Sequence, residues 1–199
     1  MDIISELNGK RILIWGYGRE GKATEHFLQR CVKPASVDIF EGKKEEIDED
    51  DYDFIIKSPG IVMNEENPKY TSETGLFLQQ FRDQVIGITG TKGKSTTSAM
   101  LYTVLKACSS RPVLLLGNIG QPCLDYFEEV TEDTIIVYEM SCHQLAHTNV
   151  SPHIAIFLNL YEEHLDYYGT VEKYFEAKSH IAAYQKSGDY FFVGENVPQ

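Results

Sequence analysis

The sequence predicts an α/β protein in which a Rossmann-like N-terminal domain (residues 1–82) precedes an incomplete P-loop-type α/β central domain (residues 83–199). Short runs rich in Val, Ile and Phe alternate with helical stretches, which is typical of parallel sheets. Two glycine-rich loops lie about seventy residues apart, and each follows an expected strand and precedes an expected helix. Loops in this position commonly hold phosphate at a helix N-terminus.

The apolar runs predict strands in the N-terminal domain at 11–15, 36–40 and 53–57, with a helix at 22–30. In the central domain they predict strands at 84–89, 112–116, 134–138, 154–158 and 190–193, with helices at 95–107 and 171–185. The boundary between the domains falls near residues 81–84. An apolar stripe at helical spacing is expected to pack the helix at 95–107 on the sheet, and it comprises Met100, Leu101, Val104 and Leu105.

Composition and charge restrict the classes of function. The chain carries 30 acidic and 18 basic residues, a net charge of −12, which disfavours binding to nucleic acid or to an anionic membrane. Its longest apolar runs are four or five residues, far below the roughly 18 needed to span a bilayer, and no signal peptide is evident. We therefore expect a cytoplasmic protein. Residues 41–53 hold eight acids and two bases and are expected to be a solvated helix or loop.

The four cysteines show no C-x-x-C spacing, which favours reduced thiols. Cys142 stands beside His143, which suggests a nucleophile and its base. Neighbouring residues on a strand, however, point to opposite faces. Cys142 is therefore expected to be a small buried thiol.

The first glycine-rich loop has the spacing G-x-G-x-x-G directly after the strand expected at 11–15. Gly16, Gly18 and Gly21 would permit a tight turn, close approach of a phosphate, and close packing of the helix on the strand. Glu41 lies twenty residues beyond Gly21, where an acidic side chain is expected to bind a ribose hydroxyl. The loop is interpreted as a nucleotide or phosphate site, and the alternative is a glycine turn kept for packing.

The second loop, residues 89–96 (TGTKGKST), contains the chemistry of a P-loop: a backbone cradle, a lysine for the β- and γ-phosphates, and a hydroxyl for Mg²⁺. The usual spacing would need glycine at position 88, where this chain has Ile88. A basic solvated turn is the alternative to an ATP or GTP site. The predicted nucleotide-binding residues are Gly90, Thr91, Lys92, Gly93, Lys94, Ser95 and Thr96.

Glu139 ends the apolar run at 134–138 and is expected to hold Mg²⁺, because P-loop sites recruit a carboxylate from the end of another strand. Asn118, Asn159 and residues 162–166 follow other strands and would reach the same edge of the sheet. Sequence spacing alone does not identify His164 or Lys178 as functional residues.

Taken in order, these segments resemble the Mur ligases. Residues 89–96 look like the ATP loop of that family, which uses the same departure from the P-loop spacing. Residues 16–21 resemble the uridine-nucleotide loop of the family. Ser58 begins a turn, residues 58–61, that resembles the turn that follows this loop in the family. Residues 118–120 are similar to a turn that contacts substrate, and residues 139–145 to the stretch with a magnesium-binding glutamate. Residues 159–166 and 176–178 look like the region with a metal-binding histidine and a carbamylated lysine.

The resemblance covers nearly the whole chain and implies an ATP-dependent amide ligase of peptidoglycan precursor synthesis. It is strongest to the member that adds D-glutamate to UDP-N-acetylmuramoyl-L-alanine through an acyl phosphate. The implied cofactors are ATP and Mg²⁺.

The resemblance also implies a role for each site residue. Lys94 would hold the β- and γ-phosphates, and Ser95 or Thr96 would bind a first Mg²⁺ together with Glu139. His164, with Lys178 carbamylated by CO₂, would bind a second metal that bridges phosphate and substrate carboxylate. The residues implied for the UDP-sugar end are Gly16, Gly18, Gly21, Glu41, Ser58 and Asn118.

The family has a third domain for the incoming amino acid, whereas this chain stops at Gln199, just after an expected strand. We therefore expect the 199-residue chain to bind nucleotide without turnover. One alternative is a non-catalytic module that binds UDP-sugar or ATP. Another is a dinucleotide oxidoreductase, which would explain the first loop and leave the second unexplained.

Overall fold

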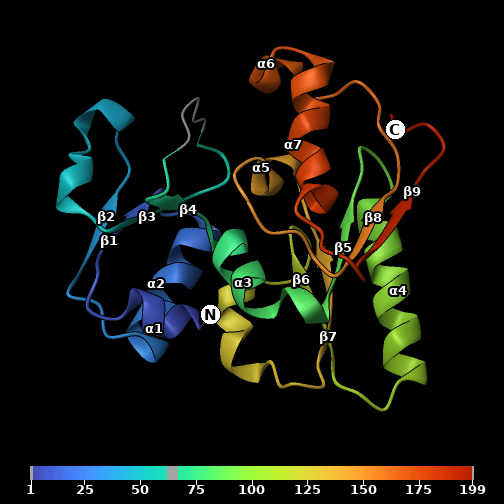
Figure 1. Cartoon of the computed structure of the whole chain (residues 1–199), viewed down its shortest axis with the longest axis horizontal. Coiled ribbons are helices and arrows are strands. Elements are labelled where there is room, and N and C mark those ends of the chain that lie inside the picture. Colours follow the sequence, from blue (N-terminus) through green and yellow to red (C-terminus); the bar gives the residue numbers. More distant parts are fainter. Residues whose placement is uncertain (1, 62–66, 199) are drawn as a thin grey trace.

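The computed structural model describes residues 2–61 and 67–198, which form two β-sheets with helices packed against them (Figure 1). The strand order is β2-β1-β3-β4 in the first sheet and β6-β7-β5-β8-β9 in the second. Neighbouring strands are parallel in both sheets. The α/β class expected from the alternating apolar runs is therefore confirmed.

The first sheet takes its strands from the N-terminal part of the chain. The strands expected at 11–15 and 36–40 have these bounds, and the third begins one residue later than expected, at Phe54. The acidic segment 41–53 lies largely exposed, as predicted, and contains two short 3-10 helices. The sequence does not predict α1, β4 or α3, each of which has nine residues or fewer. The elements are α1 (Ile3–Leu7), β1 (Arg11–Trp15), α2 (Arg19–Cys31), β2 (Ser36–Phe40), η1 (Lys44–Glu46), η2 (Glu49–Asp51), β3 (Phe54–Lys57), β4 (Tyr70–Thr71) and α3 (Glu73–Phe81).

The second sheet begins after a single 3-10 turn, and we propose the domain division there, after residue 82. Its five strands lie within one residue of the predicted bounds. The elements are η3 (Arg82–Gln84), β5 (Val85–Thr89), α4 (Lys94–Cys108), β6 (Val113–Gly117), η4 (Cys123–Glu129), β7 (Ile135–Glu139), α5 (Cys142–Leu145), β8 (Ile154–Phe157), α6 (Leu165–Tyr168), α7 (Val171–Ala183) and β9 (Tyr190–Val193). No helix among the described residues is long and apolar enough to cross a bilayer.

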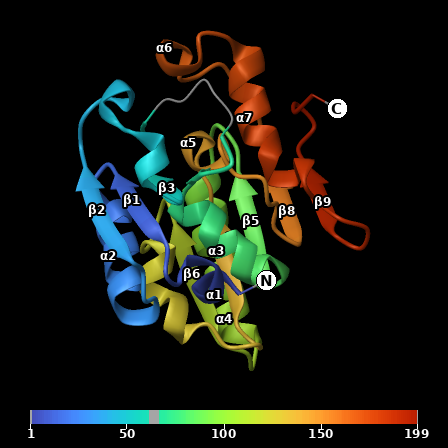
Figure 2. The same cartoon turned by 60° about the vertical axis from the view of Figure 1, so that its left-hand side comes forward.

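One continuous apolar core joins the two sheets. Helices α2 and α3 lie between the sheets (Figures 1 and 2), and their aromatic side chains meet those of η4 and β7. The ring of Phe127 lies 4.7 Å from that of Phe27 and 5.0 Å from that of Phe81. Phe77 contacts both Phe81, at 5.0 Å, and Tyr138, at 5.8 Å. The first sheet is therefore held on the second by direct aromatic packing rather than by a loose linker.

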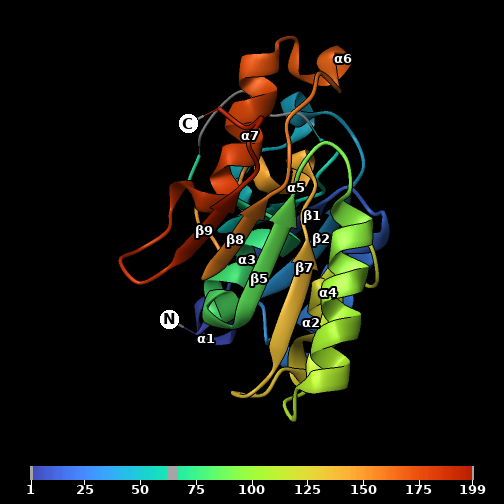
Figure 3. The same cartoon turned by 90° about the vertical axis from the view of Figure 1, so that its right-hand side faces the viewer.

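The predicted packing of the apolar stripe of α4 is wrong for half of its members. Met100 and Val104 are 65% and 57% exposed, whereas Leu101 and Leu105 are half-buried. Ser98 is the fully buried residue of this helix, which lies on β5, β6 and β7 (Figure 3). Leu101 and Leu105 follow Ser98 at helical spacing and share its face, whereas Met100 and Val104 lie two and six residues beyond it, on the opposite side. The stripe therefore straddles the boundary between sheet and solvent.

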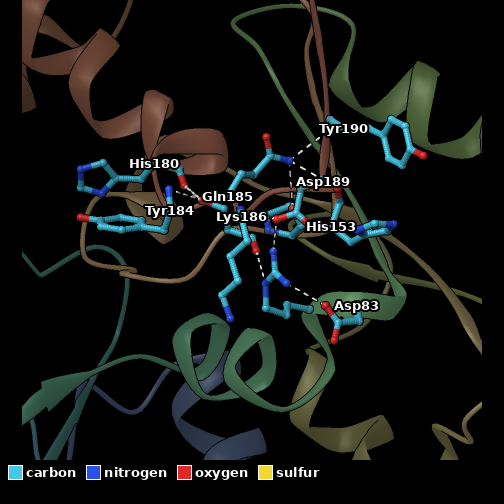
Figure 4. A network of polar contacts seen from close by, with 11 residues as sticks. Asp83, His153, His180, Tyr184, Gln185, Lys186, Asp189 and Tyr190 are labelled. Atoms are coloured by element: carbon cyan, nitrogen blue, oxygen red, sulfur yellow. Dashed lines mark hydrogen bonds and ion pairs between the residues drawn. The ribbon is translucent and has the colours of Figure 1, made fainter.

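A polar network fixes the start of β9 against the turn that links the two sheets (Figure 4). The carboxylate of Asp189 accepts hydrogen bonds from the backbone N–H of Lys186 at 2.6 Å and from the guanidinium of Arg82. Its other oxygen lies 2.8 Å from Nδ1 of His153. Burial acts to raise the pKa of Asp189, but the Lys186 N–H, His153 and Arg82 outweigh it and hold the pKa at about 2.

The substitution Asp189→Asn should destabilise the protein by about 1–3 kcal/mol at pH 7, because it weakens charged hydrogen bonds at a side chain that is only 5% exposed. The carboxylate is more acidic in the folded chain than in the unfolded one, so its stabilisation is present above about pH 4 and is lost as the pH falls toward 2. Urea unfolding of both proteins from pH 7 to pH 3 measures this difference, which should shrink with falling pH.

Asp83→Asn is the matched control, because Asp83 also pairs with Arg82 but its side chain is 81% exposed. Its effect should stay below about 0.5 kcal/mol. Equal losses in the two variants would contradict the role given to Asp189.

Candidate nucleotide-binding site

Both glycine-rich loops leave their sheets at points where the strand order reverses. In the first sheet β1 lies between β2 and β3, so the chain crosses from one side of β1 to the other. In the second sheet β5 lies in the same way between β7 and β8. In open parallel sheets, ligands bind beyond the carboxyl ends of the strands at such switch points. The fold therefore places the two loops where nucleotide binding is expected.

The first loop is a tight turn whose outer glycines are needed for packing. A Cβ on Gly21 would lie 2.2 Å from the carbonyl oxygen of Gly16, and Gly16 has φ 90°. The N–H of Gly16 donates to the carbonyl of Phe40 at 2.8 Å, and its own carbonyl accepts from the hydroxyl of Ser58 at 2.9 Å. Gly18 lies in open space at the start of α2. Within residues 16–21, the turn at Gly18 therefore remains open to a ligand.

The second loop is clamped by the chain that follows β8. The side chain of Asn159 accepts from the N–H of Lys92 at 2.8 Å and donates to the carbonyl of Lys92 at 3.0 Å. The hydroxyl of Thr91 bonds to the backbone of Tyr161. Gly93 lies just before α4 and has φ 82°, a backbone conformation that residues with a side chain rarely adopt. The loop is thus preformed, with Ser95 and Thr96 exposed in the first turn of α4.

Two lysines converge on one carbonyl oxygen of this loop. Lys94 and Lys178 each donate to the carbonyl of Gly90 at 2.9 Å, and Lys94 also reaches that of Thr91 at 3.1 Å. Lys178 is 1% exposed on α7, and burial lowers its pKa to about 8. Both ammonium groups therefore stand at the mouth of the loop, where an anionic ligand would compete with the carbonyls for them.

Glu139 is fully buried at the end of β7, and its two carboxylate oxygens have different surroundings. Its Oε1 accepts from the amide of Asn118 at 2.7 Å, whereas Oε2 has no hydrogen-bond partner among the described residues. A buried carboxylate oxygen is costly unless it is satisfied, and a hard cation such as Mg²⁺ would satisfy it. The residues present therefore fit the Mg²⁺ site expected here.

His164 is brought to the same region but next to unexpected neighbours. It has φ 57°, the one positive value for a non-glycine residue in the described ranges. The side chains around it that could bind a metal are Cys142 and His143 of α5, which sequence reasoning set aside. The expectation of a small buried thiol is confirmed, because Cys142 is 3% exposed. The premise of that reasoning was wrong, because the two residues lie on a helical turn and not on a strand. Burial, followed by the charges of His164 and Lys178, lowers the pKa of His143.

A cavity of about 360 Å³ is lined by one residue from each of the two loops, Glu20 and Lys94. Of the predicted site residues, it is lined by Lys94, Asn118, His164 and Lys178. It is also lined by residues outside the predicted set of site residues: Glu20, Pro59, Gly60, Ser141, Cys142, His143, Gln144 and Tyr174. Glu41 is exposed after β2 and does not line the cavity. The other predicted site residues that do not line it are Gly16, Gly18, Gly21, Ser58, Gly90, Thr91, Lys92, Gly93, Ser95, Thr96 and Glu139.

Glu20 is a half-buried acid at the boundary between the two sheets. Its Oε1 accepts from the amide of Gln144 at 2.8 Å, and Oε2 has no partner among the described residues. Burial raises the pKa of Glu20 to about 6 against the opposing effects of Gln144, Lys57 and Arg19. Lys57 is 2% exposed, and burial lowers its pKa to about 8. No local sequence signal marks this pair, because its members come from different elements.

The substitution Glu20→Gln should stabilise the protein at pH 8 by about 1–2 kcal/mol, since it removes a charge that is costly to bury. The folded pKa lies above the unfolded value, so the wild type loses stability relative to the variant as pH rises from about 4.5 through 6. Urea unfolding across pH 5 to 8 checks this trend.

Glu176→Gln, on the exposed side of α7, is the control and should not change the pH dependence. A difference between Glu20→Gln and the wild type that stays constant over this range would contradict the prediction.

Comparisons with known proteins add to this geometry. The family model of the Mur ligase middle domain matches residues 88–198. The UDP-N-acetylmuramoylalanine–D-glutamate ligase of Clostridium kluyveri is 34% identical over 177 residues, covering 85% of this chain and 38% of the relative. The ligase of the same name from Streptococcus pyogenes serotype M49 is 32% identical over 228 residues, covering 98% of this chain and 50% of the relative.

Among solved structures, the UDP-N-acetylmuramate:L-alanyl-gamma-D-glutamyl-meso-diaminopimelate ligase from Neisseria meningitides has a TM-score of 0.56 at 18% identity. This match covers 94% of this chain and 71% of that one, and it shows likeness of fold alone. The chain spans half or less of the length of the two curated relatives. Because the middle-domain model matches more than half of its residues, the chain belongs to the Mur ligase family.

Proposed function

We propose that this chain provides the ATP site and the UDP-sugar side of a ligase that joins D-glutamate to UDP-N-acetylmuramoyl-L-alanine. The observation that carries the proposal is that the preformed loop of residues 89–96 follows β5, while Glu139, whose Oε2 has no partner among the described residues, ends the neighbouring parallel strand β7. The names of the two curated relatives support the choice of substrates.

The residues of the loop would bind the phosphates of ATP in the following way. The ammonium group of Lys94 would leave the carbonyls of Gly90 and Thr91 for the β- and γ-phosphates. Ser95 or Thr96 and Glu139 would hold Mg²⁺, which supplies charge neutralisation at the phosphates. Asn118 would orient Glu139 through the hydrogen bond that it already donates.

Lys178 has the environment that carbamylation by CO₂ requires. A neutral amine is the form that attacks CO₂, and the lowered pKa of Lys178 makes this form accessible near pH 8. The product would be an anion on α7 facing the cavity that Lys94 and His164 also line. Such an anion could serve as a metal ligand where the free amine cannot.

The UDP-sugar end would enter the cavity from the first loop. Pro59, Gly60 and Glu20 line that side of the cavity, and Glu20 lies in the first turn of α2, two residues after Gly18. The substrate carboxylate would then lie toward Lys94 and Lys178, in line for transfer of the γ-phosphoryl group to form the acyl phosphate. The amine of D-glutamate would attack that acyl phosphate and release phosphate.

The proposal as a whole is tested by titration calorimetry and phosphate release. ATP with Mg²⁺ and UDP-N-acetylmuramoyl-L-alanine should each bind the 199-residue chain. Binding of both with phosphate release that depends on D-glutamate would identify a complete ligase, and binding without release a nucleotide-binding module. Absence of ATP binding would overturn the proposal.

The substitution Lys94→Ala should weaken ATP binding by about tenfold to a hundredfold, because it removes a charged donor to the phosphates. Calorimetry with and without the substitution measures the change. Lys106→Ala, near the exposed end of the same helix, is the control and should bind ATP as the wild type does. Unchanged affinity in Lys94→Ala would contradict the assignment of the loop.

The substitution Glu139→Gln should raise the Mg²⁺ concentration needed for half-maximal ATP binding by about tenfold, because a neutral amide is a weaker ligand for a hard cation. The new side chain retains an oxygen that can accept from Asn118, so the fold should persist. Calorimetry at several Mg²⁺ concentrations gives the midpoint.

Glu162→Gln, an exposed acid in the chain after β8, is the matched control and should leave the midpoint unchanged. A Glu139→Gln midpoint equal to that of the wild type would show that Glu139 does not hold the ion.

A further inference from the structure

The last strand of the second sheet presents an open apolar edge. Within residues 2–61 and 67–198, β9 ends the strand order and pairs on one side only, with β8 (Figure 3). Its residues Tyr190, Phe191, Phe192 and Val193 carry no charge, and their exposed fractions run from 40% to 57%. We propose that this edge pairs with the same edge of a second copy of the chain. The two five-stranded sheets would then join across a two-fold axis.

The backbone of β9 directs unused hydrogen-bonding groups outward. The N–H groups of Tyr190 and Gly194 donate to carbonyls on the β8 side, at 2.9 and 2.8 Å. Successive residues of a strand point their backbone groups to opposite sides, so Phe192, two residues from each of these, also faces β8. Phe191 and Val193 therefore direct one N–H and one C=O each toward the outside. Such an edge is a template for pairing with another chain.

A two-fold axis at Phe192 satisfies all four of these outward groups in each copy. In an antiparallel pair, two residues that face each other exchange both of their N–H···O bonds at every second position. When Phe192 faces its own counterpart, Phe191 lies opposite Val193 of the second copy, and Val193 lies opposite Phe191 of that copy. These two pairs form four N–H···O bonds. The edge is thus complementary to itself, which is the property that a two-fold dimer requires.

The side chains of β9 extend this match to the faces of the sheet. Val193 pairs with Phe157, which stacks on Phe175 of α7, so Val193 lies on the α7 face. Phe192 lies on the opposite face, beside the half-buried Ile156. Across the axis, the two Phe192 rings would occupy a pair without hydrogen bonds, where facing side chains approach most closely. The dimer would therefore bury two aromatic rings against each other.

The charge of the protein favours this strand as the place of contact. Edge strands are commonly protected by lysine, proline or inward-pointing charges, and residues 190–193 contain none of these. Asp189, just before the strand, is held inward by Arg82 and His153 (Figure 4). With a net charge of −12, two copies repel each other over most of their surfaces. An uncharged strand is where they can meet at the lowest electrostatic cost.

The surrounding chain leaves this edge open and favours a closed dimer over a filament. After β9, Asn196 donates to the carbonyl of Leu160 at 3.1 Å, so the described residues turn back toward β8. The other edge strand of the sheet, β6, is partly covered, because Gly117 donates to the carbonyl of Gln121 at 3.0 Å and Leu116 bridges to Gln121. Pairing of β9 with β6 of another copy would build an open chain of molecules, and this cover disfavours it.

The small size of the contact makes the dimer weak. Four strand residues from each copy bury far less than the roughly 800 Å² per partner that is typical of stable complexes. We therefore expect a dissociation constant of about 10–100 µM.

Sedimentation equilibrium of the 199-residue chain from about 5 to 500 µM tests the proposal. The expected result is a reversible equilibrium between monomer and dimer. A monomer over the whole range would overturn the proposal, and it is the outcome expected if β9 instead binds another protein or a following segment of a longer chain. Growth beyond the dimer would also overturn it.

The variant Phe192→Glu should weaken dimerisation at least about tenfold, because it places two carboxylates opposite each other across the axis. The side chain is 57% exposed, so the fold should persist. Met100→Glu on α4 is the matched control, since Met100 is an equally exposed apolar residue away from the edge. Equal weakening in the two variants would contradict pairing through β9.

Cysteine cross-linking tests the register in a Cys108→Ser background, which removes the exposed native thiol. Phe192→Cys should give a disulfide-linked dimer on mild oxidation, because facing residues of this kind have Cα atoms about 4.5 Å apart. Phe191→Cys is the matched control, because its two copies lie two positions apart along the strands, beyond the about 7 Å that a disulfide spans. Equal cross-linking of the two variants would refute the register.

The proposed dimer is separate from the proposed nucleotide site, because no residue of β9 lines the cavity. Phe192→Glu should therefore bind ATP as the wild type does, and Lys94→Ala should dimerise as the wild type does. Loss of dimerisation in a Lys94→Ala chain that remains folded would contradict an interface confined to β9.

Discussion

The aromatic contacts between α2, α3, η4 and β7 are the constraint on which the site depends. Phe127 lies between Phe27 and Phe81, and Phe77 meets Tyr138, so the two sheets share one core. Removing a buried aromatic side chain typically costs about 3–5 kcal/mol, so this packing strongly resists separation of the sheets. The cavity has walls from both sheets, with Glu20 on one side and Lys94 on the other, because that packing fixes their separation.

The second constraint is the backbone of the loop at residues 89–93, which sets the position of two positive charges. The carbonyl of Gly90 accepts from both Lys94 and Lys178, so a turn after β5 determines where the end of a side chain on α7 lies. Asn159 holds that turn from the chain after β8. Charge at the site is therefore fixed by main-chain geometry, which lowers the reorganisation needed when an anion binds.

The sequence predicts those parts of the protein that local patterns determine. The strand at 11–15 and the loop at 89–96 follow from short windows of sequence, and the structure has both. The burial of α4 does not follow, because the pattern identifies a stripe but not which edge of it meets the sheet. Glu20 and Gln144 are 124 residues apart, so their contact has no local signal. The assumption that residues 142 and 143 continue a strand concealed their proximity to His164.

The cavity combines chemically different surroundings in a strongly acidic protein. The net charge of the protein is −12, yet the side of the cavity near the loop at residues 89–96 is lined by two lysines, Lys94 and Lys178. Lys178 is almost fully buried. Burial disfavours the charged form of Lys178, and an anionic phosphate or carboxylate would restore it. Binding of an anion and protonation of the free amine of Lys178 are therefore coupled, whereas carbamylation of that amine would reverse its charge and favour a cation. The chemical state of one buried lysine thus decides whether this part of the cavity favours an anion or a cation.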